Sequence, residues 1–219
     1  MPDLRQQPIE IRQLGKKTPG EVVSVLARAF YPDPVFSFFA HDRLHEYSLL
    51  AKIFQAFVAD TKDFDTTWVA EAVDQSAGHE SSRQVVGAGV WLPPEGMPRR
   101  TGREIMLNVR AVRVLSRARN RVTGFKILDK MDKLHPHEPH WYLLLLGADP
   151  LVQGKGVGTR LLQAGMARAD AQGLPCYLET QKPENLAFYG RHGFAVTNTI
   201  EVPGAPTVWT MQREPNPAL

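Results

Sequence analysis

The residues best suited to chemistry lie in a glycine-rich segment in the C-terminal half of the chain. Residues 146–162 read LGADPLVQGKGVGTRLL, an apolar stretch followed by glycines at alternate positions and then by a helical pattern. Glycine lets the backbone turn tightly and leaves its N–H groups uncovered. N–H groups at the start of a helix attract anions. The segment therefore predicts a pyrophosphate-binding loop, to which Lys155 adds a charge and Thr159 a hydroxyl.

The spacing of the glycines separates this loop from two common pyrophosphate-binding motifs. A P-loop requires G-x-x-x-x-G-K-[ST], and no window of the segment fits that pattern. A dinucleotide-binding fingerprint requires G-x-G-x-x-G, whereas the pattern from Gly154 is G-x-G-x-G. Ordinary packing of a helix start remains the structural alternative to a binding loop.

Two motifs together resemble a known family. Residues 153–158, QGKGVG, match the acetyl-CoA signature [RQ]-x-x-G-x-[GA] of the Gcn5-related N-acetyltransferase (GNAT) family. Residues 183–194, PENLAFYGRHGF, loosely resemble its second signature, and the two lie at the family's separation. Within the family, residues 140–213 are most similar to puromycin N-acetyltransferase-like proteins. The resemblance implies an enzyme that takes acetyl-CoA.

The resemblance implies an α/β (α+β) fold of the GNAT type. Its mixed central sheet has about seven strands, splayed between strands four and five and flanked by helices. Residues 141–148 would be strand four and residues 175–180 strand five, with a helix over 156–172 between them. We expect one domain, 1–219, made of an acceptor-side half (1–92), a helical insertion before strand four (93–140) and an acetyl-CoA half (141–213).

The family pattern also assigns roles to individual residues. Backbone groups of strand four would pair with the pantetheine arm, and the N–H groups of the glycine loop would hold the pyrophosphate. Tyr189 would protonate the leaving thiolate, and Glu179 is a candidate general base. The backbone N–H of Ala148 or its neighbour would stabilise the oxyanion. The implied cofactor-binding residues are Leu146, Gly147, Ala148, Gln153, Gly154, Lys155, Gly156, Val157, Gly158, Thr159, Asn185 and Tyr189.

Each chemical role has a structural alternative. Tyr189 can be a core aromatic, Asn185 a helix cap and Glu179 a carboxylate bonded to nearby backbone. His140 is a second candidate base, although it precedes strand four and would lie at its far end. Cys176 is expected to be a buried apolar residue, because direct transfer needs no nucleophile.

The N-terminal half is expected to form the acceptor pocket. Aromatic residues follow the first predicted helix in the segment YPDPVFSFFAHD, and another aromatic precedes a proline pair. Such side chains suit a small-molecule primary amine with an apolar part. Packing onto the core is the alternative. A protein Lys or N-terminus as acceptor, and a CoA-binding regulatory module without catalysis, also stay open. The candidate acceptor-binding residues are Tyr31, Phe36, Phe39 and Trp91, with Phe38 beside them.

Composition excludes several other classes. Of 219 residues, 43% are hydrophobic and one is Cys, and no apolar run is long enough for a membrane span. Eleven Lys or Arg and three acids lie between Arg99 and Lys133, without a nucleic-acid-binding motif. We therefore expect a cytoplasmic monomer or homodimer that needs no metal and binds neither nucleic acid nor membrane.

The remaining elements follow from hydrophobic periodicity. Strands are expected over 8–14, 67–73, 84–92, 194–202 and 207–212, and helices over 21–30, 44–58 and 184–192. Pro32 and Pro34 are expected to end the first helix. Residues 104–134 are helical in composition, with a break expected near Gly124.

Overall fold

The computed structural model describes residues 4, 7–15, 19–31, 33–40, 43–74, 82–96 and 119–216. Residues 97–118, which belong to the helical insertion expected over 93–140, lie outside these residues, so the first part of the helical stretch expected over 104–134 is not described. Within the described residues, no helix is both long and apolar enough to cross a membrane.

The centre of the fold is a seven-stranded mixed sheet with the strand order β1-β2-β3-β4-β5-β7-β6. Neighbouring strands are antiparallel except for β4 and β5, which run parallel. This arrangement confirms the expected mixed sheet. The strands are β1 (Ile9–Gln13), β2 (Thr67–Asp74), β3 (Ser82–Leu92), β4 (Trp141–Ala148), β5 (Cys176–Thr180), β6 (Ala195–Ile200) and β7 (Val208–Arg213).

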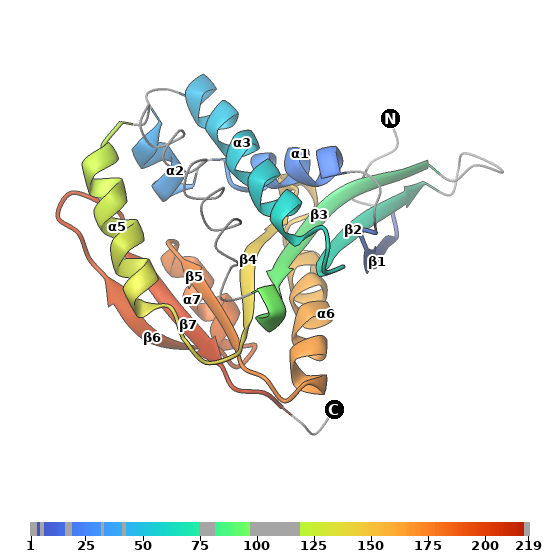
Figure 1. The fold of residues 1–219 in the computed structure, drawn as a ribbon. Coiled ribbons are helices and arrows are strands. Elements are labelled where there is room, and N and C mark those ends of the chain that lie inside the picture. Colours follow the sequence, from blue (N-terminus) through green and yellow to red (C-terminus); the bar gives the residue numbers. More distant parts are fainter. Residues whose placement is uncertain are drawn as a thin grey trace.

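Helices cover both faces of the sheet, as Figure 1 shows. On one face lie α1 (Pro19–Ala29) and α3 (Arg43–Thr61), which pack against each other, and the short α2 (Pro34–Phe39) packs against α3. On the other lie α6 (Val157–Ala171) and α7 (Pro183–Gly190). Helix α5 (Arg121–Leu134) packs beside β6. Two short 3-10 turns, η2 (Pro94–Gly96) and η3 (Pro150–Val152), follow β3 and β4.

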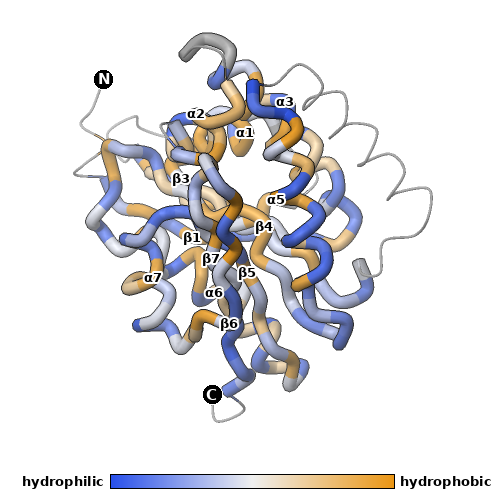
Figure 2. Tube along the Cα trace, turned by 90° about the vertical axis from the view of Figure 1, so that its left-hand side faces the viewer, coloured by the Kyte–Doolittle hydropathy of each residue, from blue (hydrophilic) through white to orange (hydrophobic). Residues whose placement is uncertain are grey.

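A β-bulge divides β4 into two parts. Val90 of β3 pairs with Leu145, but the next residue of β3 pairs with Leu143, so Leu144 is an extra residue. A bulge reverses the alternation of side chains along a strand. Leu143 accordingly packs in the core under α6, whereas Leu145 packs in the core under α1 and α3. Figure 2 shows β4 as a largely hydrophobic segment in the middle of the molecule.

The first helix ends at Ala29, ahead of Pro32 and Pro34, as the sequence predicts. Pro34 also begins α2, because Asp33 caps this helix by accepting the N–H of Val35 at 3.0 Å and proline needs no N–H there. The expectation for Gly124 is wrong. Gly124 lies inside α5 and does not break it. A Cβ at Gly124 would stand 2.5 Å from the ring of Phe39, so the glycine is needed for close packing.

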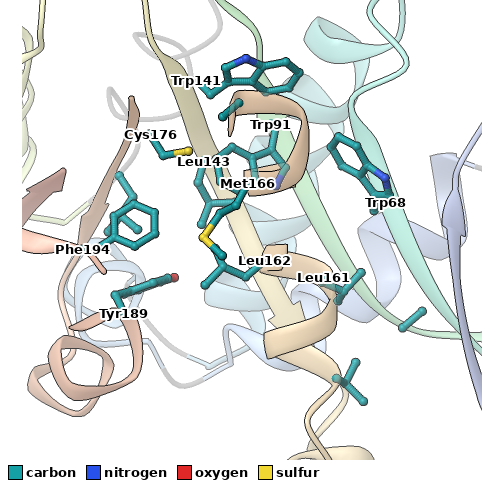
Figure 3. Close-up of a cluster of buried hydrophobic side chains, with 14 of the residues drawn as sticks. Trp68, Trp91, Trp141, Leu143, Leu161, Leu162, Met166, Cys176, Tyr189 and Phe194 are labelled. Carbon is teal, nitrogen blue, oxygen red and sulfur yellow. The ribbon is translucent and has the colours of Figure 1, made fainter. Parts of the chain in front are cut away.

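The larger core cluster lies between the sheet and α6 (Figure 3). Trp91 is fully buried there, edge to face with Trp141 at 6.4 Å between ring centroids. A Cβ at Gly165 would lie 2.2 Å from the Trp91 ring, so α6 approaches β3 closely only because it carries glycine at this position. Burial raises the pKa of the Cys176 thiol to about 12, which fits an apolar core residue.

Candidate active site

The parallel strands β4 and β5 separate halfway along their length. They pair only from Trp141 with Cys176 to Leu143 with Leu178, and the bulge at Leu144 marks the fork. Asp149 donates its N–H to Val86 of β3 at 2.8 Å. Because backbone groups alternate along a strand, those of Ala148 and Leu146 point away from β3 into the fork. An extended ligand can therefore pair with this edge of β4 as an added strand.

A cavity of 1140 Å³ passes through the fork. Its walls come from α1, α2, α3 and α5 on one side of the sheet and from the start of α6 and from α7 on the other. The volume exceeds the 300–1,000 Å³ typical of small-molecule sites. It therefore has room for two substrates that meet at the fork.

The glycine loop forms one end of this cavity. Gly154 and Gly156 have φ of 77° and 75°, in the left-handed region that glycine adopts without strain. Gly156 caps α6, and the first intrahelical bond runs from the N–H of Arg160 to its carbonyl at 3.0 Å. The preceding N–H groups of the first turn belong to Val157, Gly158 and Thr159, which line the cavity. These donors, with the positive end of the helix dipole, fit a pyrophosphate.

The side chains of Asp149 and Gln153 hold the loop against the sheet. Asp149 accepts the N–H of Leu151 at 3.0 Å, and its other oxygen forms an ion pair with Arg28 of α1 at 2.7 Å. The Gln153 side chain donates to the carbonyl of Ala148 at 3.1 Å. The family-signature glutamine thus links the loop to the open edge of β4.

Tyr189 reaches the fork from α7. Its ring packs against Phe194 and Phe188, and Figure 3 shows its hydroxyl directed inward from α7. Tyr189 also lines the cavity. Burial raises the pKa of the Tyr189 hydroxyl, which keeps the group protonated at neutral pH. The residue thus combines a core position with access to the cavity, and a protonated phenol there can act as an acid.

Asn185 lies in the first turn of α7 but does not cap it. The cap position is Lys182, whose carbonyl accepts the N–H of Asn185 at 3.0 Å. The Asn185 side chain instead donates to the hydroxyl of Thr180 at the end of β5, at 2.9 Å. Its remaining amide capacity faces the cavity that it lines.

Glu179 is the first residue of β5 beyond the paired segment, so it lies at the fork. Its side chain is 5% exposed and lines the cavity. The Nδ1 atom of His135 lies 3.7 Å from its Oε1 atom. His140, the other candidate base, is buried behind His135 and is absent from the cavity wall. Burial lowers the pKa of His140, so its imidazole stays neutral.

The acceptor side of the cavity contains part of the expected aromatic set. Phe36 and Phe39 line it, and Phe36 packs edge to face with Phe54 at 5.5 Å. Trp91 is a correction, because it is enclosed in the core under α6 and does not line the cavity. Tyr31 is 38% exposed and also lies off the cavity wall, as do Phe38 and Lys155.

Sequence reasoning missed the carboxylate of Asp33. This side chain lines the cavity, is almost fully buried and lies 4.0 Å from Lys182 across the cavity. Burial raises the pKa of Asp33 despite the hydrogen bond from Val35. Asp33 lies between two prolines after the first helix, which indicates a helix cap. Nothing in the sequence indicates that its side chain lines a cavity.

The fold and this site together define an acetyltransferase. A family model described as Acetyltransferase (GNAT) family matches residues 48–194, and the chain belongs to this family. The expected family and enzyme class are therefore confirmed.

Individual relatives agree with this assignment. An uncharacterized N-acetyltransferase of Schizosaccharomyces pombe is 24% identical over 82% of this chain and 72% of its own length. A structure described as histone acetyltransferase HPA2 and related acetyltransferase, from Corynebacterium glutamicum, has a TM-score of 0.63 at 22% identity, covering 96% of this chain and 99% of its own. A polyamine N-acetyltransferase of Drosophila melanogaster has a TM-score of 0.52 at 18% identity, covering 94% and 100%. At these identities, the structures show a shared fold.

Proposed function

We propose that the chain transfers the acetyl group of acetyl-CoA directly to a primary amine of a small molecule. The observation that carries the proposal is the cavity through the β4–β5 fork. The glycine loop lines one end of it, and aromatic side chains and the carboxylates of Asp33 and Glu179 line the other part. The family supports acetyl-CoA as the donor.

The donor would lie with its pyrophosphate on the first turn of α6 and its pantetheine arm along the open edge of β4. Gln153 to Thr159 would supply the anion site, except for Lys155, which does not line the cavity. Leu146 and Ala148 would offer backbone groups, with Gly147 between them, and Asn185 would contact the arm from α7. Acetyl-CoA supplies the activated thioester, and the chain supplies positioning and proton transfer.

Three groups would carry the proton and charge changes. Glu179, directly or through a water molecule, would accept a proton from the incoming ammonium. A backbone N–H of β4 at the fork, at Ala148 or its neighbour, would stabilise the oxyanion. Tyr189 would give its proton to the departing thiolate, and its raised pKa keeps that proton available.

The chemistry of the acceptor side favours a small cationic amine with an apolar part. Phe36 and Phe39 offer apolar surface, while Asp33 and Glu179 are carboxylates on the same cavity wall. Carboxylates attract a protonated amine as it enters. The polyamine N-acetyltransferase that shares this fold is a precedent for a small cationic amine as acceptor.

The proposal treats residues 1–219 as one cytoplasmic domain, with 1–92 and 93–140 on the acceptor side and 141–213 on the acetyl-CoA side. The positions of α1, α2, α3 and α5 against α6 and α7 support that division.

The test begins with calorimetric titration of acetyl-CoA into the protein. A thiol-release assay then compares agmatine, spermidine, arylalkylamines, puromycin, a lysine peptide and a free N-terminal peptide. Micromolar binding with fastest turnover on a small amine supports the proposal. Preference for a peptide moves the acceptor to proteins, as the histone acetyltransferase neighbour would suggest. Binding without turnover on any amine favours a regulatory module, and absence of binding refutes the proposal.

A further inference from the structure

A pair of histidines lies directly behind Glu179 and is not explained by the mechanism above. His135 follows the end of α5 and His140 precedes β4. The Nε2 atoms of the two rings are 3.1 Å apart. The other nitrogen of His140, Nδ1, is 2.7 Å from the carbonyl oxygen of Glu138. The other nitrogen of His135, Nδ1, is 3.7 Å from Oε1 of Glu179. Glu179, His135 and His140 thus form a row of neighbouring side chains that starts at the cavity.

The contacts determine which ring nitrogens of His135 and His140 carry hydrogen. A carbonyl oxygen only accepts, so Nδ1 of His140 carries hydrogen and donates to Glu138. Because burial lowers the pKa of His140, the ring is neutral and its Nε2 atom has a lone pair. The 3.1 Å contact then requires hydrogen on Nε2 of His135. The one nitrogen of His135 that remains able to take up a proton is Nδ1, which faces Glu179.

The groups around His135 fix the ring in this orientation. Tyr142 of β4 and Tyr177 of β5 pack edge to face on it, with ring centroids 4.9 and 4.8 Å away. Its backbone N–H donates to the carbonyl of Asp132 in α5 at 3.3 Å. Burial raises the pKa of the Tyr177 hydroxyl, so that group is neutral. Glu179 from β5 and the neutral His140 complete the titratable groups that face the ring.

We propose that His135 is a positioning residue that receives, through Glu179, the proton that the amine releases. His140 holds His135 in the tautomer that leaves Nδ1 free to accept it. The inference deepens the proposed acetyl transfer and rests on it. The side chain of His135 is 21% exposed, so it can pass the proton to solvent, whereas His140 is 3% exposed.

The proton balance of the reaction agrees with a single acceptor of this kind. An ammonium has three hydrogens on nitrogen and the amide product has one, so two protons leave. One replaces the proton that Tyr189 gives to the thiolate, which becomes the CoA thiol. The other passes by way of Glu179 to Nδ1 of His135 and from there to water. No oxidant or further reactant is needed.

The first test reads the hydrogens directly and does not depend on catalysis. Nitrogen-15 NMR of histidine-labelled full-length protein should show His140 protonated on Nδ1 and neutral His135 protonated on Nε2. Glu179→Gln should change the nitrogen-15 chemical shift of Nδ1 of His135, because this atom lies 3.7 Å from the Glu179 carboxylate. The opposite tautomer of His135, or no response to Glu179→Gln, would refute proton transfer from Glu179 to His135, whether or not any amine is acetylated.

The second test separates proton transfer from a structural role. His135→Gln keeps an amide that can donate to His140 but takes up no proton, so kcat/KM near pH 7 should fall by at least about tenfold. The deficit should shrink as the pH approaches the pKa of the amine, where free amine needs no base. The KM for acetyl-CoA should stay within about twofold.

Matched variants in the same loop serve as controls. His140→Gln keeps an acceptor for the Nε2 hydrogen of His135 and should retain most activity, whereas His140→Leu should show the pH-dependent deficit. His137→Gln changes an exposed histidine of the loop and should have no effect. A loss in His135→Gln that is equal at every pH and is accompanied by a lower Tm would assign a purely structural role and refute the relay.

Discussion

Replacing Tyr189 by Phe tests the proposed acid with little disturbance of the fold. The ring is buried between Phe188 and Phe194, and phenylalanine preserves that packing. Among the described residues, no hydrogen bond holds the Tyr189 hydroxyl in place. Removing the oxygen should therefore change the free energy of unfolding by no more than about 1 kcal/mol in either direction, because Tyr189 lines the cavity and its hydroxyl loses no protein partner. For a chain of this length, that corresponds to about 2–4 °C or less in Tm.

The kinetic effect should be much larger. General acid catalysis contributes about 10²–10⁴-fold in rate, which corresponds to about 2.7–5.4 kcal/mol of barrier. In stopped thiol-release assays, kcat should fall by that factor while the calorimetric Kd for acetyl-CoA changes less than about twofold. Tyr47→Phe, which removes a hydroxyl from an exposed position of α3, should match the wild type. If Tyr189→Phe keeps more than about half of the wild-type kcat, the hydroxyl is not the acid and Tyr189 acts only in packing.

Three further changes test the loop, the core and the sheet edge. Gly156→Glu should abolish acetyl-CoA binding in calorimetry, because it places a negative charge and a side chain at a left-handed residue with φ of 75° in the anion site. The control Gly173→Ala, at φ of 65° after α6, should lower the free energy of unfolding by only about 1 kcal/mol and leave binding intact. Gly165→Ala should lower stability to chemical denaturation by about 1–3 kcal/mol, because its Cβ would stand 2.2 Å from the packed indole ring; unchanged stability would contradict that close contact. Hydrogen bonds from Arg12 hold the pKa of Glu71 below its usual range, so this carboxylate stabilises the fold above about pH 4.3, the unfolded value, and loses that effect as the pH falls through the folded value. Glu71→Gln should therefore be less stable than the wild type near pH 7, with the difference shrinking as the pH falls through the lowered folded pKa of Glu71, and a constant difference would refute the assignment.

The sequence predicted the helices and strands of residues 141–213 well because local signals act there together. The strand over 141–148 is β4, and the helix over 156–172 differs from α6 by one residue at each end. Glycines at the positions with positive φ mark the loop regardless of tertiary contacts. Tyr189 and Asn185 were proposed as site residues from a motif, and the motif did not predict which side chains contact them.

The acceptor side was predicted less well because tertiary contacts decide it. Pro34 serves as a helix start since Asp33 caps it, and Gly124 serves close packing of Phe39. Trp91, Tyr31 and Phe36 are all aromatic, and their residue type does not separate them. Trp91 lies on the face of β3 under α6, Tyr31 lies in the turn after α1, and Phe36 lies in α2 on the cavity wall. His135 meets Glu179 although they lie far apart in sequence and belong to no recognised motif.

The bulge at Leu144 gives β4 two side-chain phases, one before and one after the extra residue. A deletion of this one residue would remove the bulge and restore regular alternation along β4. Leu145 and Gly147 would keep the face that they have now, toward α1, so the deletion would change the backbone at the fork without changing which side chains face the core. The edge that opens at the fork would be free to continue its parallel pairing with β5. One leucine therefore marks the difference between a continuous parallel sheet and a sheet with a channel through it, and insertions or deletions should be tolerated far less here than in the loops around the cavity.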